Sequence, residues 1–285
     1  MSIVVLDPDG RYAADCPNWL ADSGRSLVLL TGRAGEYPGF SAVRVVRRYA
    51  ESAAVETTVL DLARQGGVSA VVALDPADQI RAGGLRDHLG LAGQSRDTAL
   101  ALADGVAAQD LLARAGVPAT RREEVRRVAD LYWWAHQWGY PLAVRRRRAA
   151  GRPVGAELAE LAELADEAAL RAFVAGGFLP DDPSVVPSLT VEPLTTGERH
   201  HGPGLAVTDA VLAALPSDPG HPYAVEAVRE AGGDWLVHGL GYHPAARPAR
   251  ALVRAQAGLD PELELKLDAD ADLELKLEPA EEGLR

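Results

Sequence analysis

The sequence predicts an α/β protein with a parallel sheet in its N-terminal part and an α+β region after it. Two observations favour this fold class. Short apolar runs alternate with stretches of helical spacing, which is typical of a parallel sheet. After Gly177 prolines and glycines become frequent, and segment 222–244 has a hairpin pattern with Gly-Gly-Asp at its turn. The four apolar runs lie at 2–7, 26–32, 41–46 and 68–75.

The helical stretches are identified by their apolar spacing and by glycine or proline stops. A helix over 97–120 is expected to end at the Gly-Val-Pro break at 116–118. The alanine- and leucine-rich segment 156–177 predicts one amphipathic helix, too short for a coiled coil. The remaining expected helices lie at 54–67, 79–91, around 128–138, 205–214 and 246–259.

Composition limits the classes of protein to consider. The 285 residues are 47% hydrophobic, enough for one large or two modest domains. The formal net charge is −12, which argues against a nucleic-acid partner. No apolar run reaches the roughly 18 residues of a membrane span. Cys16 is the only cysteine, so no intrachain disulfide framework exists and a cytoplasmic location is expected.

Positive charge is carried by arginine over most of the chain. The only lysines are Lys266 and Lys276, so no chemistry in the first 265 residues can use a lysine amine. Four consecutive arginines, Arg145 to Arg148, follow a predicted strand. Three interpretations stay open for this run: an anion site at Arg145, a solvated strand end, or a surface for nucleic acid or for an acidic partner, including the chain's own acidic tail.

The C-terminal segment 259–285 is acidic and repetitive. Ten acidic residues stand against Lys266, Lys276 and Arg285, which gives −7 and leaves −5 for the remainder of the chain. The sequence Leu-Glu-Leu-Lys-Leu occurs at 263 and again at 273, and this alternation is a strand pattern. The segment is expected to dock on the body, to add a strand to a partner, or to stay disordered.

Several segments, taken in order, carry a resemblance to a known family. They are VSAVVALDPADQIRAGGLRDHLGLAG from 68, SRDTALALADGVAAQDLLARAGVP from 95, WAHQWGYPLAVRRRRAAGRPVG from 134, SLTVEPLTTGE from 188 and YAVEAVREAGGDWLVHGLGYHP from 223. Together they resemble the ATP-grasp superfamily of carboxylate–amine ligases over about 68–245. The resemblance implies an enzyme that forms an acyl-phosphate from a carboxylate and ATP.

The resemblance also implies site residues. Arg145 takes the position of a phosphate-binding lysine, and Gly151 and Gly155 are what is left of a glycine-rich loop. Glu192 matches the acid of the hinge strand that holds the adenine and ribose. Glu226 matches the first magnesium ligand, and the implied cofactors are ATP and magnesium.

Two departures from the family pattern fall at the implied site. Gly105 stands where a first phosphate-binding lysine is expected, after Asp104. Gly239 stands where a second magnesium carboxylate is expected, and Asp234 and Glu198 are the candidates to replace it. Binding of ATP and magnesium is therefore expected to be weak or absent.

These observations predict a Rossmann-like domain over 1–93, a reduced ATP-grasp-like domain over 94–258 and the acidic tail over 259–285. The predicted function is that of a degenerate, non-catalytic ATP-grasp-like protein, a partner or accessory protein in a biosynthetic pathway. The expected partners are another protein or a second copy of the chain, with neither nucleic acid nor membrane. The alternative is an ATP-dependent carboxylate–amine ligase with a remodelled site.

Overall fold

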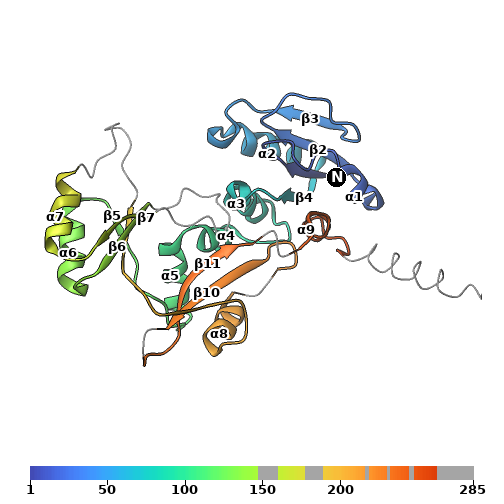
Figure 1. The fold of residues 1–285 in the computed structure, drawn as a ribbon. Coiled ribbons are helices and arrows are strands. Elements are labelled where there is room, and N and C mark those ends of the chain that lie inside the picture. The colour runs from blue at the N-terminus through green and yellow to red at the C-terminus, as the bar shows by residue number, and fades with distance from the viewer. Residues whose placement is uncertain (147–159, 177–188, 216–217, 230–231, 244–246, 262–285) are drawn as a thin grey trace, which may run out of the picture.

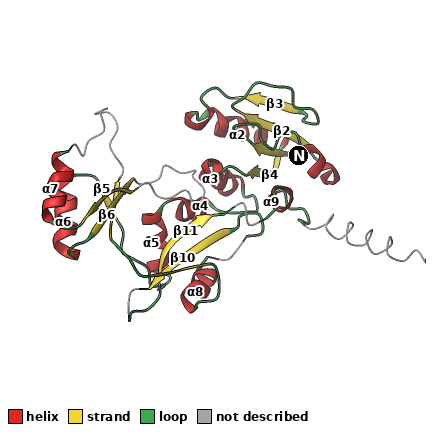
Figure 2. Ribbon diagram, viewed as in Figure 1, coloured by secondary structure: helices red, strands yellow, loops and turns green. Residues whose placement is uncertain are grey.

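The strands of the protein form three sheets. The computed structural model describes residues 1–146, 160–176, 189–215, 218–229, 232–243 and 247–261. Within these residues one four-stranded sheet is parallel, and a second four-stranded sheet and a three-stranded sheet are antiparallel. In the view of Figure 1 the two four-stranded sheets lie on opposite sides of the three-stranded sheet, and Figure 2 shows helices beside each sheet. The prediction of an α/β protein with a parallel sheet is confirmed.

The parallel sheet is built from the first 73 residues. Its strands are β1 (Ser2–Leu6), β2 (Ser26–Thr31), β3 (Ala42–Val45) and β4 (Val68–Ala73), in the order β3-β2-β1-β4. Side chains alternate between the two faces of a strand, so β1 places Ile3 and Val5 in one core and Val4 and Leu6 in another. Apolar residues on both faces explain why these runs are continuous in the sequence.

Helices cover both faces of the parallel sheet. Residues of α2 (Ala54–Gly66) and α3 (Gln79–Leu89) pack into the core that contains Val4. The short α1 (Cys16–Trp19) and the C-terminal α9 (Ala249–Gln256) pack into the core that contains Ile3. Three turns of 3-10 helix complete this part: η1 (Ala21–Ser23), η2 (Tyr49–Glu51) and η3 (Pro76–Asp78).

The predicted helix over 97–120 is two helices. They are α4 (Arg96–Ala103) and α5 (Gly105–Arg114), and the chain turns between them at Asp104. Asp104 has extended backbone angles, and its carboxylate accepts the N–H groups of Val106 at 2.9 Å and Ala107 at 3.1 Å. A side chain that caps the second helix in this way ends the first one, so the prediction of one helix was wrong.

The antiparallel four-stranded sheet has the order β5-β8-β6-β7. Its strands are β5 (Glu123–Val125), β6 (Leu142–Arg146), β7 (Glu160–Leu164) and β8 (Leu189–Pro193). One face packs against α6 (Val128–Trp138) and α7 (Glu167–Ala175), around a core with Leu131, Leu142, Leu170 and Val191. The opposite face is left for polar residues.

The prediction of one helix over 156–177 was wrong for residues 160–164, which form β7. This strand pairs with β6, and Leu142 lies opposite Leu164 in the register. Leu164 is buried while Glu163 is exposed, as a half-buried strand requires. The helix begins only at Glu167, after Asp166 accepts the N–H of Ala169 at 2.8 Å. Pairing with β6 overrode the helix propensity of the alanine-rich repeat.

The three-stranded sheet contains the predicted hairpin. Its strands are β9 (Glu198–His201), β10 (Tyr223–Arg229) and β11 (Leu236–Tyr242), in the order β11-β10-β9. The core on one face includes residues of α5 and of α8 (Ala206–Ala214). The register of β10 and β11 shifts between Glu226 and Ala227, so His238 is the extra residue of a β-bulge.

A short connection joins the two antiparallel sheets. Ala119 forms a parallel bridge with Val237 of β11, and the N–H of Thr120 donates to the carbonyl of Val237 at 2.9 Å. The chain then enters β5 at Glu123. Arg122, immediately before β5, is therefore held between the edges of two sheets.

The C-terminal helix joins the parallel sheet to the three-stranded sheet. Gln256 of α9 is buried, and its Oε1 accepts the N–H of Ala73 at 2.8 Å and Nη2 of Arg86 at 3.2 Å. Its Nε2 donates to the carbonyl of Gly220, close to the start of β10, at 2.8 Å. Burial lowers the pKa of Arg86 to about 10, still above neutral pH, so this junction contains a buried positive charge.

Among the described residues, no helix combines the length and the apolar character that crossing a lipid bilayer requires.

Candidate functional site

The most heavily buried ion pairs of the antiparallel sheets centre on Glu192. This residue is 2% exposed. Its Oε2 lies 2.6 Å from Nε and 2.5 Å from Nη2 of Arg122, and its Oε1 lies 2.6 Å from Nε of Arg145. The sequence-predicted residues Arg145 and Glu192 are therefore in direct contact. One carboxylate is shared by two guanidinium groups.

The strand register explains how these groups meet. Leu189 and Val191 point into the core beneath α6 and α7, so Thr190 and Glu192 point to the opposite face. Ala143 of β6 lies opposite Glu192, and Arg145 is two residues further along on the same face. Alternation within β6 and β8 thus places both side chains on the face opposite α6 and α7.

The two arginines keep Glu192 ionised. Burial alone would raise the pKa of this carboxyl, but Arg122, His238 and Arg145 together lower it below its ordinary value of 4.5. A buried carboxylate stays charged when opposite charges and hydrogen bonds offset its desolvation. The group is therefore a carboxylate at neutral pH.

Arg122 is a site residue that the sequence did not reveal. Its side chain is 9% exposed, and Nη2 also donates to the carbonyl of His238 at 3.4 Å. A Cβ atom added to Gly105 would lie 2.0 Å from Nη1 of Arg122. The missing side chain at Gly105 therefore leaves the space that the guanidinium fills. The sequence showed only that Gly105 stands where a lysine was expected. The structure places the guanidinium of Arg122 in the space beside this glycine.

Gly105→Ala is expected to lower the free energy of unfolding by about 1–3 kcal/mol, because the new methyl group displaces Arg122 from its contacts with Glu192. The matched control is Gly66→Ala at the end of α2, where an added Cβ meets nothing within 4 Å. This control should be neutral or stabilising by up to about 1 kcal/mol. Urea unfolding of both variants is the measurement, and equal effects would contradict the close packing at Gly105.

Glu226, the predicted magnesium ligand, lies on the neighbouring three-stranded sheet. Its side chain is 27% exposed and forms an ion pair with Nη1 of Arg199 on β9. Gly239 lies directly opposite in the register of β11, and its ideal Cβ position is 3.6 Å from Oε2 of Glu226. The position facing Glu226 thus has no side chain.

Neither candidate for a second metal carboxylate is brought to Glu226. Glu198 forms an ion pair of 2.6 Å with Arg229. Asp234 lies outside β11, five residues before Gly239, the position that pairs with Glu226. Nor do the described residues contain a group of three or more His, Cys, Asp or Glu side chains that could hold a metal ion. A lone carboxylate already paired with a guanidinium does not fit the oxygen-rich shell that magnesium requires.

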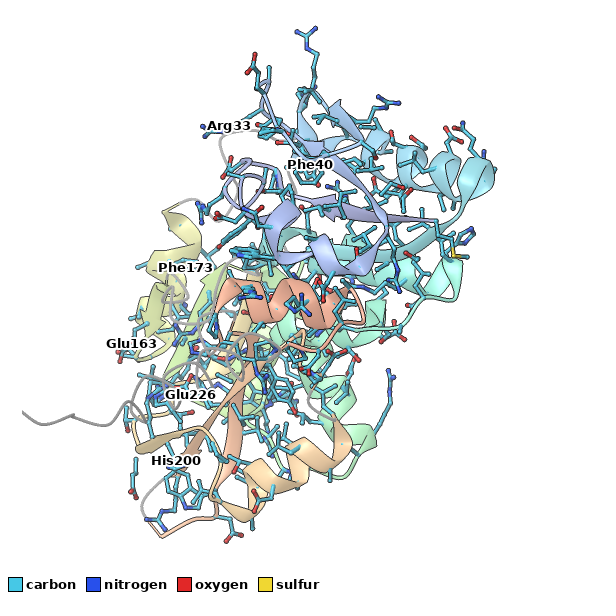
Figure 3. The ribbon with its side chains drawn as sticks, turned by 90° about the vertical axis from the view of Figure 1, so that its right-hand side faces the viewer. Arg33, Phe40, Glu163, Phe173, His200 and Glu226 are labelled. Atoms are coloured by element: carbon cyan, nitrogen blue, oxygen red, sulfur yellow. The ribbon has the colours of Figure 1, made fainter. Side chains whose placement is uncertain are left out.

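His238 lies between the two ion-paired groups. The β-bulge places it beside Gly239, and its Nδ1 lies 3.4 Å from the hydroxyl of Thr120. Burial lowers the pKa of His238, and the charges of Glu192, Arg122, Glu226 and Arg199 all act on it. The groups on the two sheets therefore share one electrostatic environment. Figure 3 labels Glu226 together with His200 of the neighbouring strand β9.

Of the other predicted residues, Gly151 and Gly155 lie outside the part of the chain that the structure describes. Their role in a phosphate loop stays a prediction. The same holds for Arg147 and Arg148 of the arginine run.

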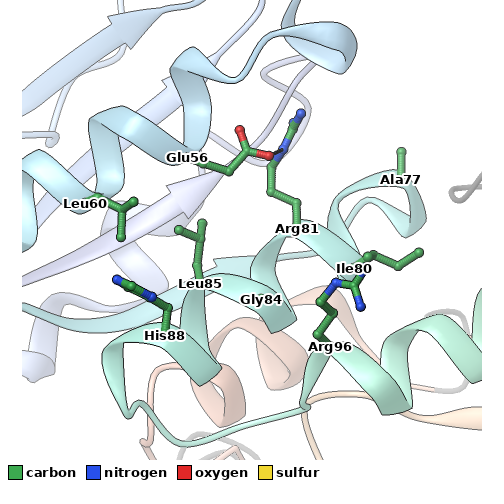
Figure 4. Close-up of a pocket in the computed structure, with 9 residues that line it drawn as sticks. All are labelled: Glu56, Leu60, Ala77, Ile80, Arg81, Gly84, Leu85, His88 and Arg96. Carbon is green, nitrogen blue, oxygen red and sulfur yellow. Dashed lines mark hydrogen bonds and ion pairs between the residues drawn. The ribbon is translucent and has the colours of Figure 1, made fainter.

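A separate pocket of about 490 Å³ lies between α2 and α3 (Figure 4). Glu56 and Leu60 line one side, and Arg81, Leu85 and His88 line the other. Nε of Arg81 and Oε1 of Glu56 are 2.8 Å apart. The pocket contains neither Glu192 nor any other predicted site residue, so it is distinct from the charged groups described above.

Solved structures with the same arrangement of elements are numerous, although no protein-family model and no curated protein match the sequence. The L-amino acid ligase from Bacillus licheniformis superposes with a TM-score of 0.57 and 13% identity, over 89% of this chain and 68% of that chain. N5-carboxyaminoimidazole synthetase from Staphylococcus aureus, complexed with ADP, superposes with a TM-score of 0.57 and 11% identity, over 85% of this chain and 70% of that chain. The RimK domain ATP-grasp protein from Sphaerobacter thermophilus superposes with a TM-score of 0.53 and 16% identity, over 91% of this chain and 99% of that chain. The chain therefore has the fold of the ATP-grasp superfamily.

Proposed function

We propose that this chain is a non-catalytic ATP-grasp-like protein that acts as a partner or accessory protein in a biosynthetic pathway. The observation that carries the proposal is the environment of Glu226. Its carboxylate is paired with Arg199, and Gly239 faces it where a second carboxylate would be needed. The proposed organisation is a Rossmann-like domain over 1–93, the reduced ATP-grasp-like domain over 94–258 and the acidic tail.

The chemistry of acyl-phosphate formation explains why this environment matters. Transfer of a phosphoryl group to a carboxylate brings several negative charges together, and magnesium ions normally offset them. Magnesium is held by carboxylate oxygens and water in near-octahedral geometry. The guanidinium group of Arg199 competes with the metal for the carboxylate oxygens of Glu226. Phosphoryl transfer that depends on magnesium at Glu226 is therefore disfavoured.

The proposal is tested by incubating the full-length protein with ATP, magnesium and mixtures of amino acids, with hydroxylamine present to trap any acyl-phosphate as a hydroxamate. The L-amino acid ligase from Bacillus licheniformis serves as the positive control for the assay. We expect neither hydroxamate nor acceptor-dependent ADP release from this chain. Acceptor-dependent ADP release that is lost in Glu226→Gln would refute the non-catalytic assignment.

A second candidate function is a ligase with a remodelled site, and one observation favours it. Arg122 fills the space beside Gly105, so together with Arg145 it supplies two cations near Glu192. Arginine can bind phosphate oxygens bidentately, so the loss of both lysines does not by itself remove phosphate binding. The hydroxamate assay decides between the two candidates, because only the ligase produces a signal.

A further inference from the structure

The two edges of the parallel sheet differ in how their backbone groups are satisfied. At β4 the carbonyl of Val71 accepts hydrogen bonds from Nε and Nη2 of Arg86 at 3.1 and 2.8 Å. The N–H of Ala73 donates to Oε1 of Gln256 at 2.8 Å. The side chains of Arg86 and Gln256 are buried, so they close this edge. The opposite edge is β3, which pairs with β2 alone among the described strands (Figure 1).

The outer side of β3 has no neighbouring strand within the described part of the chain. The N–H of Val46 donates to the carbonyl of Thr31, next to β3, at 2.8 Å. Backbone groups alternate in direction along a strand, so those of Val43 and Val45 point away from β2. Among the described residues, these groups have one partner, a guanidinium nitrogen of Arg44 at 3.4 Å from the carbonyl of Val43. An edge of this kind is a template for one more strand.

The side chains of β3 follow an apolar, basic, apolar order. Val45 is 47% exposed, and Arg44 beside it is also exposed. Segment 41–48 contains three arginines and no acidic residue. Val43 packs against the core that contains Ile3, so Val43 and Val45 face one side of the sheet and Arg44 faces the other. The edge is therefore complementary to a strand in which apolar residues alternate with acidic ones.

The acidic C-terminal segment has this pattern. Residues 262–285 lie outside the part of the chain that the structure describes, and they contain nine acidic residues against three basic ones. Each copy of Leu-Glu-Leu-Lys-Leu, at 263–267 and at 273–277, begins with the same alternation as Val43-Arg44-Val45, with glutamate at the position of the arginine. Opposite charges on neighbouring strands attract, and leucine beside valine buries apolar surface.

The last described residues lie close to the start of β2, the neighbour of β3. Nη1 of Arg25, the residue before β2, donates to the carbonyl of Ala257 at 3.1 Å. Leu259 packs against the core that contains Leu27 of β2. A strand added to the outer side of β3 lies two strand spacings from β2, which is about 10 Å. The C-terminal segment therefore starts within a short distance of the open edge.

The length of chain after Pro261 favours the second copy of the repeat. The first copy begins two residues after Pro261, which is about 7 Å of extended chain. The second copy begins twelve residues after Pro261, which allows a span of up to about 40 Å. The second copy can therefore reach the outer side of β3 and still choose its register, whereas the first copy has little chain with which to do so.

From this arrangement we propose that residues 273–277 pair with β3 of the same chain and extend the parallel sheet by one strand. Glu274 then lies on the face of Arg44, and the leucines on either side of it lie on the face of Val45. The acidic tail thereby covers an edge that is otherwise open to strands of other molecules. The inference concerns the parallel sheet and does not depend on whether the chain turns over ATP.

Residue-resolved amide hydrogen exchange of the full-length protein tests the pairing. Leu275→Pro removes a backbone N–H from the second copy and breaks its strand. Leu265→Pro makes the same change in the first copy and is the matched control. We expect the amides of Val43 and Val45 to exchange at least about tenfold more slowly in the wild type and in the control than in Leu275→Pro. The amide of Val46, which donates to Thr31, should be protected in all three and shows that each is folded.

A charge swap tests the position of Glu274. Arg44→Glu places like charges side by side and should speed exchange at Val45 about fivefold or more. Adding Glu274→Arg to the same chain restores opposite charges and should slow exchange again. The control is Arg64→Glu on α2, where the arginine is 74% exposed and pairs with Asp61 at 2.7 Å. This control should leave exchange at Val45 within about twofold of the wild type.

Slow exchange that Leu275→Pro abolishes, Leu265→Pro preserves and the charge swap restores supports the inference. It is overturned if Val43 and Val45 exchange in the wild type as fast as in an unstructured peptide, or if Leu275→Pro or Arg44→Glu leaves their exchange unchanged. Equal loss of protection in both proline variants overturns the assignment to the second copy. Protection that rises with protein concentration, together with a dimer in sedimentation, overturns pairing within one chain and identifies a second copy as the partner.

Discussion

Replacing Glu192 with alanine is expected to lower the free energy of unfolding by about 3–5 kcal/mol. The substitution leaves the guanidinium groups of Arg122 and Arg145, 9% and 14% exposed, without the carboxylate that they share. Removing one partner of a buried ion pair lowers the free energy of unfolding by this amount because the charge of the other partner stays buried without compensation. Urea denaturation at neutral pH measures the effect. Glu198→Ala, which breaks the exposed pair with Arg229, should cost less than about 1 kcal/mol.

The stabilising effect of Glu192 should also depend on pH in a defined direction. Its pKa in the folded protein is lowered below 4.5, so the unfolded chain binds the proton more readily than the folded one. The contribution of the carboxylate is therefore complete above about pH 4.5 and is lost as the pH falls through the lower folded value. The difference in unfolding free energy between wild type and Glu192→Gln should shrink over that interval. A difference that stays constant to lower pH would argue against an ionised Glu192.

Leu252→Ala in the C-terminal helix α9 is expected to lower the free energy of unfolding by about 2–5 kcal/mol. Leu252 is 1% exposed and packs into the core that contains Ile3 and Leu29 of the parallel sheet. Removing three carbon atoms from such a site leaves a cavity that its neighbours fill only partly. The helix is also held by Arg254, whose guanidinium contacts both carboxylate oxygens of Asp22 at 2.8 and 2.9 Å.

The control for this prediction is Leu212→Ala on α8, where the leucine is 37% exposed. Its loss should cost less than about 1 kcal/mol. The two variants compare the same chemical change at a buried and at an exposed position in helices of similar length. A small effect at Leu252 would show that α9 does not pack on the N-terminal sheet in solution.

Local patterns were sufficient for much of the fold. The parallel strands, the hairpin around Gly232 and the helices at α2, α3 and α8 follow from apolar spacing and from glycine or proline stops. The patterns were insufficient where a local tendency competed with a distant partner. Residues 160–164 have helix-forming composition, yet they form β7 because β6 offers backbone groups to pair with. The break at Asp104 escaped notice because an aspartate suits both a helix surface and a helix cap.

The residues of the candidate site also fall into those that sequence motifs identified and those that only the structure revealed. Arg145, Glu192 and Glu226 were identifiable from their motifs, and the structure brings Arg145 and Glu192 into contact. The motifs did not reveal Arg122 or Arg199. Each lies outside the expected segments and reaches its carboxylate across a strand or sheet boundary.

By itself, the sequence determined which residue types were available: no lysine in the first 265 residues, a glycine at 105 and a glycine at 239. Only the tertiary structure decided what fills the space that those glycines leave. Arg122 occupies the volume beside Gly105, whereas Glu226 faces Gly239 with Arg199 as its cation. The physical reason is that composition and spacing report one strand or helix at a time. A buried charge, in contrast, is stabilised by groups that only the packing of separate sheets brings within hydrogen-bond distance.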